Sequence, residues 1–219
     1  MTGFILGIVS SLAATVLTLG AGWLGSKRSR HWAVRVLSKL TALGIQRSYS
    51  HQKSANLDLS ADLAKARWVK VLAGRGNELT RDSFQMVWRE SDTRLESVQV
   101  LLPDPGKRSS SFLEVREAEM RRFDAGITPG LLSRQVRSNI DYILTMAGEH
   151  RNIELRLFDF QNICRIIITD QVAYFTVYPA ADHGRNGPCL VFSHPGVLYD
   201  FALRMFAVTW SRATSAVKG

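Results

Sequence analysis

Residues 164–178 read CRIIITDQVAYFTVY, and this stretch carries the clearest signal for the fold. Residues 164–169 and 173–178 are both rich in β-branched and aromatic side chains, and the polar pair Asp170 and Gln171 lies between them. Runs of this composition are typical of strands, and a short polar break between two such runs favours a hairpin. The stretch therefore predicts two neighbouring strands of a sheet.

Further strands and helices are predicted on both sides of this hairpin. The strands are expected at residues 68–73, 98–102, 154–158 and 189–192. Apolar residues at helical spacing predict helices at residues 80–95, 111–123 and 195–214, and a fourth that is capped at Thr128, has Pro129 at its first position and runs to residue 147. Strands that alternate with helices and end in a hairpin predict an α/β fold, a mixed sheet flanked by helices.

The composition fits one globular domain with a short appendage. The chain has 219 residues, of which 46% are hydrophobic and 21% charged, so it is neither disordered nor of low complexity. Its two cysteines are too few for a disulfide scaffold or a zinc site built on thiolates, which favours a reducing compartment. We also find no phosphate-binding loop, dinucleotide-binding turn or metalloprotease motif, and expect no cofactor or metal.

The N-terminus is predicted to cross a membrane. Residues 4–24 read FILGIVSSLAATVLTLGAGWL and carry no charge, and about 20 such residues are enough to span the hydrocarbon core. The alternatives are a cleavable signal peptide and a buried core helix. A signal peptide is disfavoured because no basic residue precedes the run. Small residues at helical spacing along the run make self-association, and therefore a homo-oligomer, plausible.

A basic stretch follows the apolar run and sets the expected orientation. Residues 27–50 contain six basic and no acidic residues, so the positive-inside rule places them at the anionic cytoplasmic leaflet. This predicts a single-pass protein of the inner, cytoplasmic membrane, with its N-terminus outside and its C-terminal domain in the cytoplasm. The residues expected at the membrane interface are Trp23, Lys27, Arg28, Arg30, Trp32, Arg35 and Lys39.

Residues 31–46 have the pattern of a basic amphipathic helix. Such a helix either lies along the leaflet or links the span to the domain that follows. Residues 48–60 are polar and without periodicity, and are expected to be the boundary. The predicted organisation is a transmembrane anchor at 1–26, a juxtamembrane helix at 27–50 and a cytoplasmic domain at 51–219.

The net charge of +9 gives little support to a nucleic-acid partner. Six of these charges belong to residues 27–50, and residues 1–26 carry none. The remaining 169 residues therefore have a net charge of only +3, which is small for a domain that contacts many phosphates.

The order of several short phrases resembles phospholipase D-like domains, in particular the half-size, nuclease-related members found in bacterial regulators. The phrases lie between residues 61 and 213: ADLAKARWVKVLAGRG, SVQVLLPDP, SFLEVREAE, IELRLFD, RIIITDQVAYFTVYPA, GPCLVFS and LYDFALRMFAVTWSRA. The resemblance implies the fold of one phospholipase D-like half and a scaffold that accommodates phosphate.

The catalytic motif of that family is not preserved. The motif is His-x-Lys followed, after four residues, by Asp. With its Asp placed on Asp170, the Lys position falls on Arg165 and the His position on Ile163. Isoleucine cannot act as the nucleophile, so the expectation is a protein that is not an enzyme. An arginine can still hold a phosphate through two hydrogen bonds.

The resemblance and the positions of strand ends suggest a ligand site without catalysis. Its expected residues are Arg75, Arg156, Arg165, Asp170 and Tyr178. Each also has an ordinary structural explanation, such as a surface ion pair or a turn. The leading hypothesis is a membrane-anchored sensor or effector that binds a nucleotide signal or a partner and controls the membrane helices, by analogy with bacterial stress or anti-phage systems. The alternatives are a membrane-tethered interaction scaffold without a small ligand, an enzyme with unrecognised residues and a nucleic-acid binder.

Overall fold

The computed structural model describes residues 32, 36, 38, 41–80, 82–89, 94–106, 110–180 and 182–216. Among these residues, no helix combines the length and the apolar character that crossing a bilayer requires. The predicted span lies outside the described residues, as do most of the predicted membrane-interface residues. Of the latter, Trp32 is described; it is helical and exposed.

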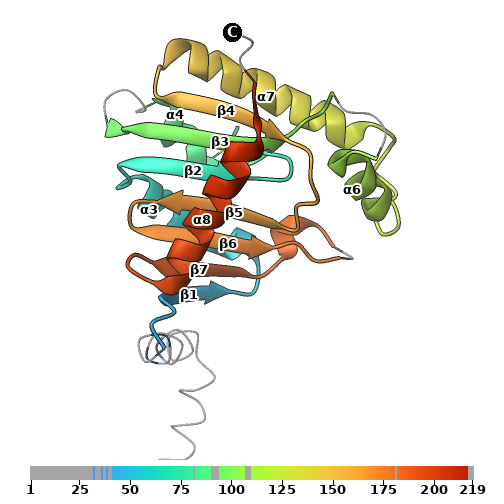
Figure 1. The fold of residues 1–219 in the computed structure, drawn as a ribbon. Helices are drawn as coiled ribbons and strands as arrows, with labels where there is room; N and C mark the ends of the chain where they lie inside the picture. Colours follow the sequence, from blue (N-terminus) through green and yellow to red (C-terminus); the bar gives the residue numbers. More distant parts are fainter. Residues whose placement is uncertain are drawn as a thin grey trace, which may run out of the picture.

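The centre of the molecule is an eight-stranded mixed sheet (Figure 1). The strands are β1 (Ile45–Tyr49), β2 (Trp68–Leu72), β3 (Ser97–Pro103), β4 (Ile153–Phe158), β5 (Cys164–Thr169), β6 (Val172–Val177), β7 (Cys189–Ser193) and β8 (Thr214–Ser215). Their order is β1-β7-β6-β5-β2-β3-β4-β8. Strands β2, β3 and β4 are parallel, and every other neighbouring pair is antiparallel. The predicted hairpin is confirmed as β5–β6.

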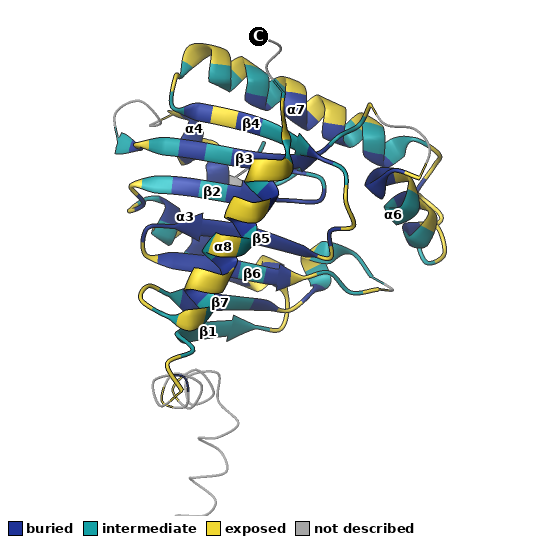
Figure 2. Ribbon diagram, viewed as in Figure 1, coloured by how far each residue is buried: buried dark blue, intermediate teal, exposed yellow. Residues whose placement is uncertain are grey.

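Helices cover both faces of the sheet. They are η1 (Gln52–Ala55), α3 (Asn56–Leu63), η2 (Asp82–Phe84), α4 (Gln85–Arg89), α6 (Phe112–Met120), α7 (Leu131–Glu149), η3 (Gly184–Asn186) and α8 (Val197–Arg212). Helix α8 crosses the front face in Figure 1, whereas α3 and α4 lie behind the sheet. Strand β5 is buried along its whole length (Figure 2). The α/β fold class with a mixed sheet and flanking helices is confirmed.

The expected boundary at residues 48–60 is wrong. Strand β1 pairs with β7 and forms the edge of the sheet, and α3 buries Leu59 and Leu63 in the core. Arg47 of β1 forms ion pairs with Asp58 and Asp62 of α3. An edge strand held by charged pairs shows no apolar alternation, so the sequence pattern did not reveal it. Residues 41–50 are therefore not helical, and β1 belongs to the globular unit, which was expected to begin at residue 51.

The predicted cap of the long helix is also wrong. Helix α7 begins at Leu131, after Gly130 in a left-handed conformation with φ of 74°. The buried carboxylate of Glu117 in α6 accepts hydrogen bonds from the backbone N–H groups of Gly130 (2.7 Å) and Leu132 (3.0 Å). A carboxylate from a neighbouring helix satisfies the free N–H groups better than a local hydroxyl, because it also complements the helix dipole. Thr128 and Pro129 precede the helix.

Candidate functional site: a cationic cavity at the ends of three strands

A cavity of about 570 Å³ lies where β2 ends, β5 begins and β6 ends. The strand register explains this meeting point. Leu72, at the end of β2, is paired with Ile166 of β5, and Arg165 is paired with Thr176 of β6. Tyr178, the residue after β6, therefore lies near the loop that follows β2, because both strands end on the same side of the sheet.

Three of the five predicted ligand residues line this cavity: Arg75, Arg165 and Tyr178. Two further arginines line it as well. Arg116 belongs to α6 and Arg185 to η3. Arg116 could have been predicted from the sequence, because it lies four residues from both Phe112 and Met120. It is thus on the buried face of its helix, where an arginine is unusual.

Arg165 is the most buried cation of the site. Its side chain is 7% exposed and its Nη1 forms an ion pair with Glu78. Its Nε has no hydrogen-bond partner among the described residues. Burial lowers the pKa of Arg165, because the charged form loses hydration in the protein interior. An anion that reached this guanidinium would offset that loss.

Arg75 lies in the loop after β2, which is held from several sides. The Asn139 side chain donates to the Arg75 carbonyl (2.8 Å), and Nη1 of Arg75 donates to Gln135 (3.3 Å). Burial lowers the pKa of Arg75, and the positive charges of Arg116 and Arg185 lower it further. These influences indicate that three guanidinium groups lie close enough to repel one another.

Tyr178 forms part of the cavity wall and is hydrogen-bonded to the loop that follows β2. Its hydroxyl accepts a hydrogen bond from the buried backbone N–H of Gly74 (3.0 Å). Its ring lies against Gly184, where an added Cβ would come within 2.7 Å of a ring carbon. Burial raises the pKa of Tyr178, so the side chain remains a neutral phenol at physiological pH.

A histidine–carboxylate pair also lines the cavity, and no local sequence pattern predicted it. His183 Nε2 lies 3.0 Å from Asp124 Oδ2. The two residues are far apart in the chain, and His183 stands in the loop between β6 and β7. Only the tertiary structure brings them together. The second ring nitrogen of such a histidine is a candidate proton acceptor for a bound ligand.

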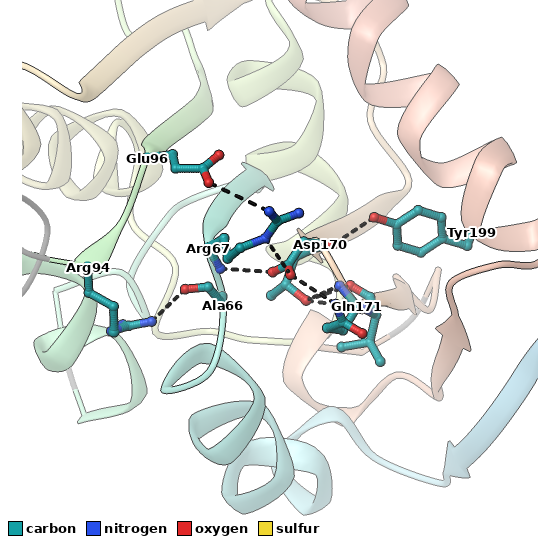
Figure 3. A network of polar contacts seen from close by, with 9 residues as sticks. Ala66, Arg67, Arg94, Glu96, Asp170, Gln171 and Tyr199 are labelled. Carbon is teal, nitrogen blue, oxygen red and sulfur yellow. Dashed lines mark hydrogen bonds and ion pairs between the residues drawn. The ribbon is translucent and has the colours of Figure 1, made fainter.

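The other two predicted ligand residues lie elsewhere. Asp170 is at the opposite end of β5 from Arg165, five residues and therefore about 16 Å along the strand. There it accepts hydrogen bonds from the backbone N–H (2.8 Å) and Nε (3.3 Å) of Arg67 and from Gln171 (3.0 Å), in the network of Figure 3. Burial opposes the charge on Asp170, but these hydrogen bonds outweigh it and hold its pKa below the usual range.

Arg156 points to α8 instead of the cavity. Its Nη1 donates to the carbonyl of Trp210 (3.0 Å), and its guanidinium lies 4.6 Å from the centre of the Trp210 ring. Asp170 and Arg156 therefore have structural roles in stabilising the turn between β5 and β6 and the packing of α8.

The charged residues that line the cavity are predominantly basic. Four arginines face two carboxylates, those of Glu78 and Asp124. The described residues include no group of histidine, cysteine and acidic side chains that could hold a metal ion. The cavity is therefore suited to an anion that arginines bind through charge-assisted hydrogen bonds.

Comparison with solved structures finds several with a similar fold. One is TrmBL2, an archaeal chromatin protein reported to bind DNA in a novel mode (TM-score 0.49, 15% identity, 95% of this chain and 68% of that chain). Another is Nuc from Salmonella typhimurium, a phospholipase D family member (TM-score 0.44, 12% identity, 75% of this chain and 91% of Nuc). A third is NucT from Helicobacter pylori (TM-score 0.42, 11% identity, 75% of this chain and 92% of NucT).

These similarities concern the fold alone. No protein-family model and no curated protein matches the sequence. Phospholipase D family members are thus among the structures that this α/β chain resembles in fold, at low identity.

Proposed function

We propose that this protein is a membrane-anchored sensor or effector that binds a phosphate-bearing ligand, such as a nucleotide, in the cationic cavity, without turning it over. The observation that carries the proposal is the convergence of Arg75, Arg116, Arg165 and Arg185 on one cavity with only two carboxylates. Phosphate oxygens accept two hydrogen bonds from a guanidinium in its own plane, which makes arginine the preferred residue for such ligands.

The size of the cavity fits this class of ligand. Pockets for small molecules and cofactors commonly measure about 300–1,000 Å³, and this one falls within that range. Its lining also includes apolar residues beside the arginines, among them Phe84, Leu79 and Leu132. A ligand with an anionic end and a flat or apolar end would use both parts.

Strand β1 lies between the cavity, which Gln52 lines, and residues 41–44, and the chain is hydrogen-bonded near both ends of the strand. At one end of β1, Gln52 donates its backbone N–H to Gly187 (2.9 Å), beside the loop that carries Arg185. At the other end, Gly44 accepts from the Ser193 N–H (2.7 Å), and Ala42 accepts from Val197 of α8 (3.2 Å). These contacts support coupling between ligand binding and the predicted membrane helices.

The proposal is tested with the full-length chain in nonionic detergent. Unfolding is followed by heating with and without adenosine 5′-monophosphate, for wild type, Arg165→Met and the matched control Arg156→Met. Ligand at 100 times its dissociation constant adds about 2.7 kcal/mol, which raises the midpoint by about 5–10 °C for a chain of this size. We expect the shift in wild type and in the control, and its loss in Arg165→Met.

Equal responses of wild type and Arg165→Met would contradict the proposal. A folded wild type that responds to neither adenosine monophosphate nor pyrophosphate would favour the interaction scaffold, which predicts a co-purifying protein instead. The anchor is tested separately, because removal of residues 1–26 is expected to release the protein from the membrane fraction. Retention of the shortened chain at the membrane would contradict that part of the proposal.

A second candidate function is hydrolysis of a phosphate ester. It is favoured by one observation, the pairing of His183 with Asp124 at the cavity. In this mechanism water attacks phosphorus while the histidine accepts its proton, the ester P–O bond breaks and the alkoxide or phenolate leaves, and the arginines stabilise the charge on the phosphoryl oxygens. Release of phosphate from p-nitrophenyl phosphate by wild type, and its loss in His183→Ala, would establish the enzyme and exclude a purely sensory role.

A further inference from the structure

We propose that the carboxylate of Glu78 is an internal substitute for the ligand's phosphate, which a ligand must displace, and that the surplus of arginines around it selects phosphate monoesters, which are dianions, over phosphate diesters, which are monoanions. This inference rests on the proposed function and adds the class of ligand. It is carried by the contacts that Glu78 makes within the cavity.

Glu78 is held from two sides. Its Oε2 forms the ion pair with Nη1 of Arg165, and its Oε1 accepts a hydrogen bond from the side chain of Gln52. Glu78 is the more exposed partner, with 38% of its side chain accessible against 7% for Arg165. The carboxylate thus occupies the position where an anion would reach the buried guanidinium. A ligand can bind Arg165 through Nη1 only if this carboxylate moves away.

The exchange of Glu78 for a ligand sets a charge requirement. The carboxylate belongs to the same chain and competes at a high effective concentration. A phosphate diester brings one negative charge and displaces one, so the exchange contributes little binding free energy. A monoester brings a second charge, and its extra terminal oxygen can accept from Nε of Arg165, which has no partner among the described residues.

The neighbouring cations strengthen this preference. Arg116 already forms an ion pair with Glu119 (3.0 Å). Arg75 and Arg185 line the cavity and form no ion pair with any residue that the structure describes. A dianion on Arg165 would therefore meet two further guanidinium groups whose charges are not neutralised by a carboxylate, whereas a monoanion would leave much of that charge uncompensated.

The test compares two nucleotides that differ in one ester bond. Adenosine 5′-monophosphate is a dianion at pH 8, because its second pKa is near 6, and 3′,5′-cyclic adenosine monophosphate is a monoanion. Both are titrated calorimetrically at pH 8 and low salt into the full-length chain in nonionic detergent. The variants are Glu78→Gln and, as a matched control, Glu96→Gln, which removes a glutamate that is paired with Arg67 outside the cavity.

We expect wild type and Glu96→Gln to bind the monoester at least tenfold more tightly than the cyclic diester. In Glu78→Gln the affinities for both nucleotides should rise at least tenfold, because neither ligand then has to displace a carboxylate from Arg165, while the preference for the monoester is kept. Should Glu78→Gln fold poorly, Glu78→Asp keeps the charge but shortens the side chain, which weakens its contact with Arg165 and is expected to raise both affinities in the same direction.

Three results would overturn the inference. Wild type could bind the diester as tightly as the monoester, or Glu78→Gln could leave both affinities within twofold of wild type. In either case binding itself is observed, so the proposed function stands and only the role of Glu78 falls. If wild type and Glu78→Gln are both folded by circular dichroism and bind neither nucleotide, the proposed function fails and the inference fails with it.

Discussion

Replacement of Tyr178 by phenylalanine is the most informative single change to the cavity wall. The substitution keeps the ring against Gly184 and removes only the hydroxyl that accepts the hydrogen bond from Gly74 N–H at 3.0 Å. Gly74 is buried, so its N–H has little access to solvent in exchange. Leaving a buried donor without a partner costs about 1–3 kcal/mol. We expect Tyr178→Phe to lower the free energy of unfolding by about 1–2 kcal/mol.

The measurement is urea unfolding of the full-length chain in nonionic detergent, followed by tryptophan fluorescence. With a slope of about 2 kcal/mol per molar urea, the expected loss moves the midpoint down by about 0.5–1 M. Tyr142→Phe is the matched control, because the Tyr142 hydroxyl makes no hydrogen bond to a described residue and its ring packs edge-on against Trp88. If Tyr178→Phe and the control shift the midpoint equally, the hydrogen bond between the Tyr178 hydroxyl and Gly74 does not stabilise the fold, and our reasoning is refuted.

Three further predictions concern residues outside the cavity. The pKa of Asp170 is held low in the folded state, so the carboxylate stabilises the fold above its unfolded pKa of about 4, and this stabilisation is lost as the pH falls through the folded pKa. Asp170→Asn should therefore reduce the loss of unfolding free energy between neutral and acid pH. An unchanged loss would contradict this. Cys164 and Cys189 are buried, and burial raises the pKa of both thiols, that of Cys164 to about 11. Neither thiol should therefore react with Ellman's reagent at pH 8 until urea unfolds the protein. Arg156→Met should weaken the packing of α8 on β4 and lower the thermal midpoint, while nucleotide affinity stays within twofold of wild type.

The central elements of the fold were predictable because their signals are local. The runs that became β2 to β7 are rich in β-branched and aromatic side chains, and α8 shows apolar residues at helical spacing along its length. Propensity and periodicity act within a few residues, so one sequence suffices to recognise them. The edge strands β1 and β8 were missed, because an edge strand needs no apolar alternation and β8 has only two residues.

The residues of the site were predictable only in part. Strand-end positions led to Arg75, Arg165 and Tyr178, and the structure places all three in the lining of one cavity. The same reasoning also named Asp170, although it follows β5 directly, at the end of the strand opposite to Arg165. An extended strand advances about 3.3 Å per residue, so two residues five positions apart lie at opposite ends of the strand.

Local composition and periodicity predicted an α/β chain with a mixed sheet and with arginines near several strand ends. Which charged residues meet depends on the tertiary structure. Arg116 and Glu117 are neighbours in α6, yet one lines the cavity and the other caps α7. His183 meets Asp124, and Glu78 meets Arg165, across long stretches of chain. These pairings depend on strand register and helix packing, which bring distant residues within hydrogen-bonding distance and leave no mark in local composition.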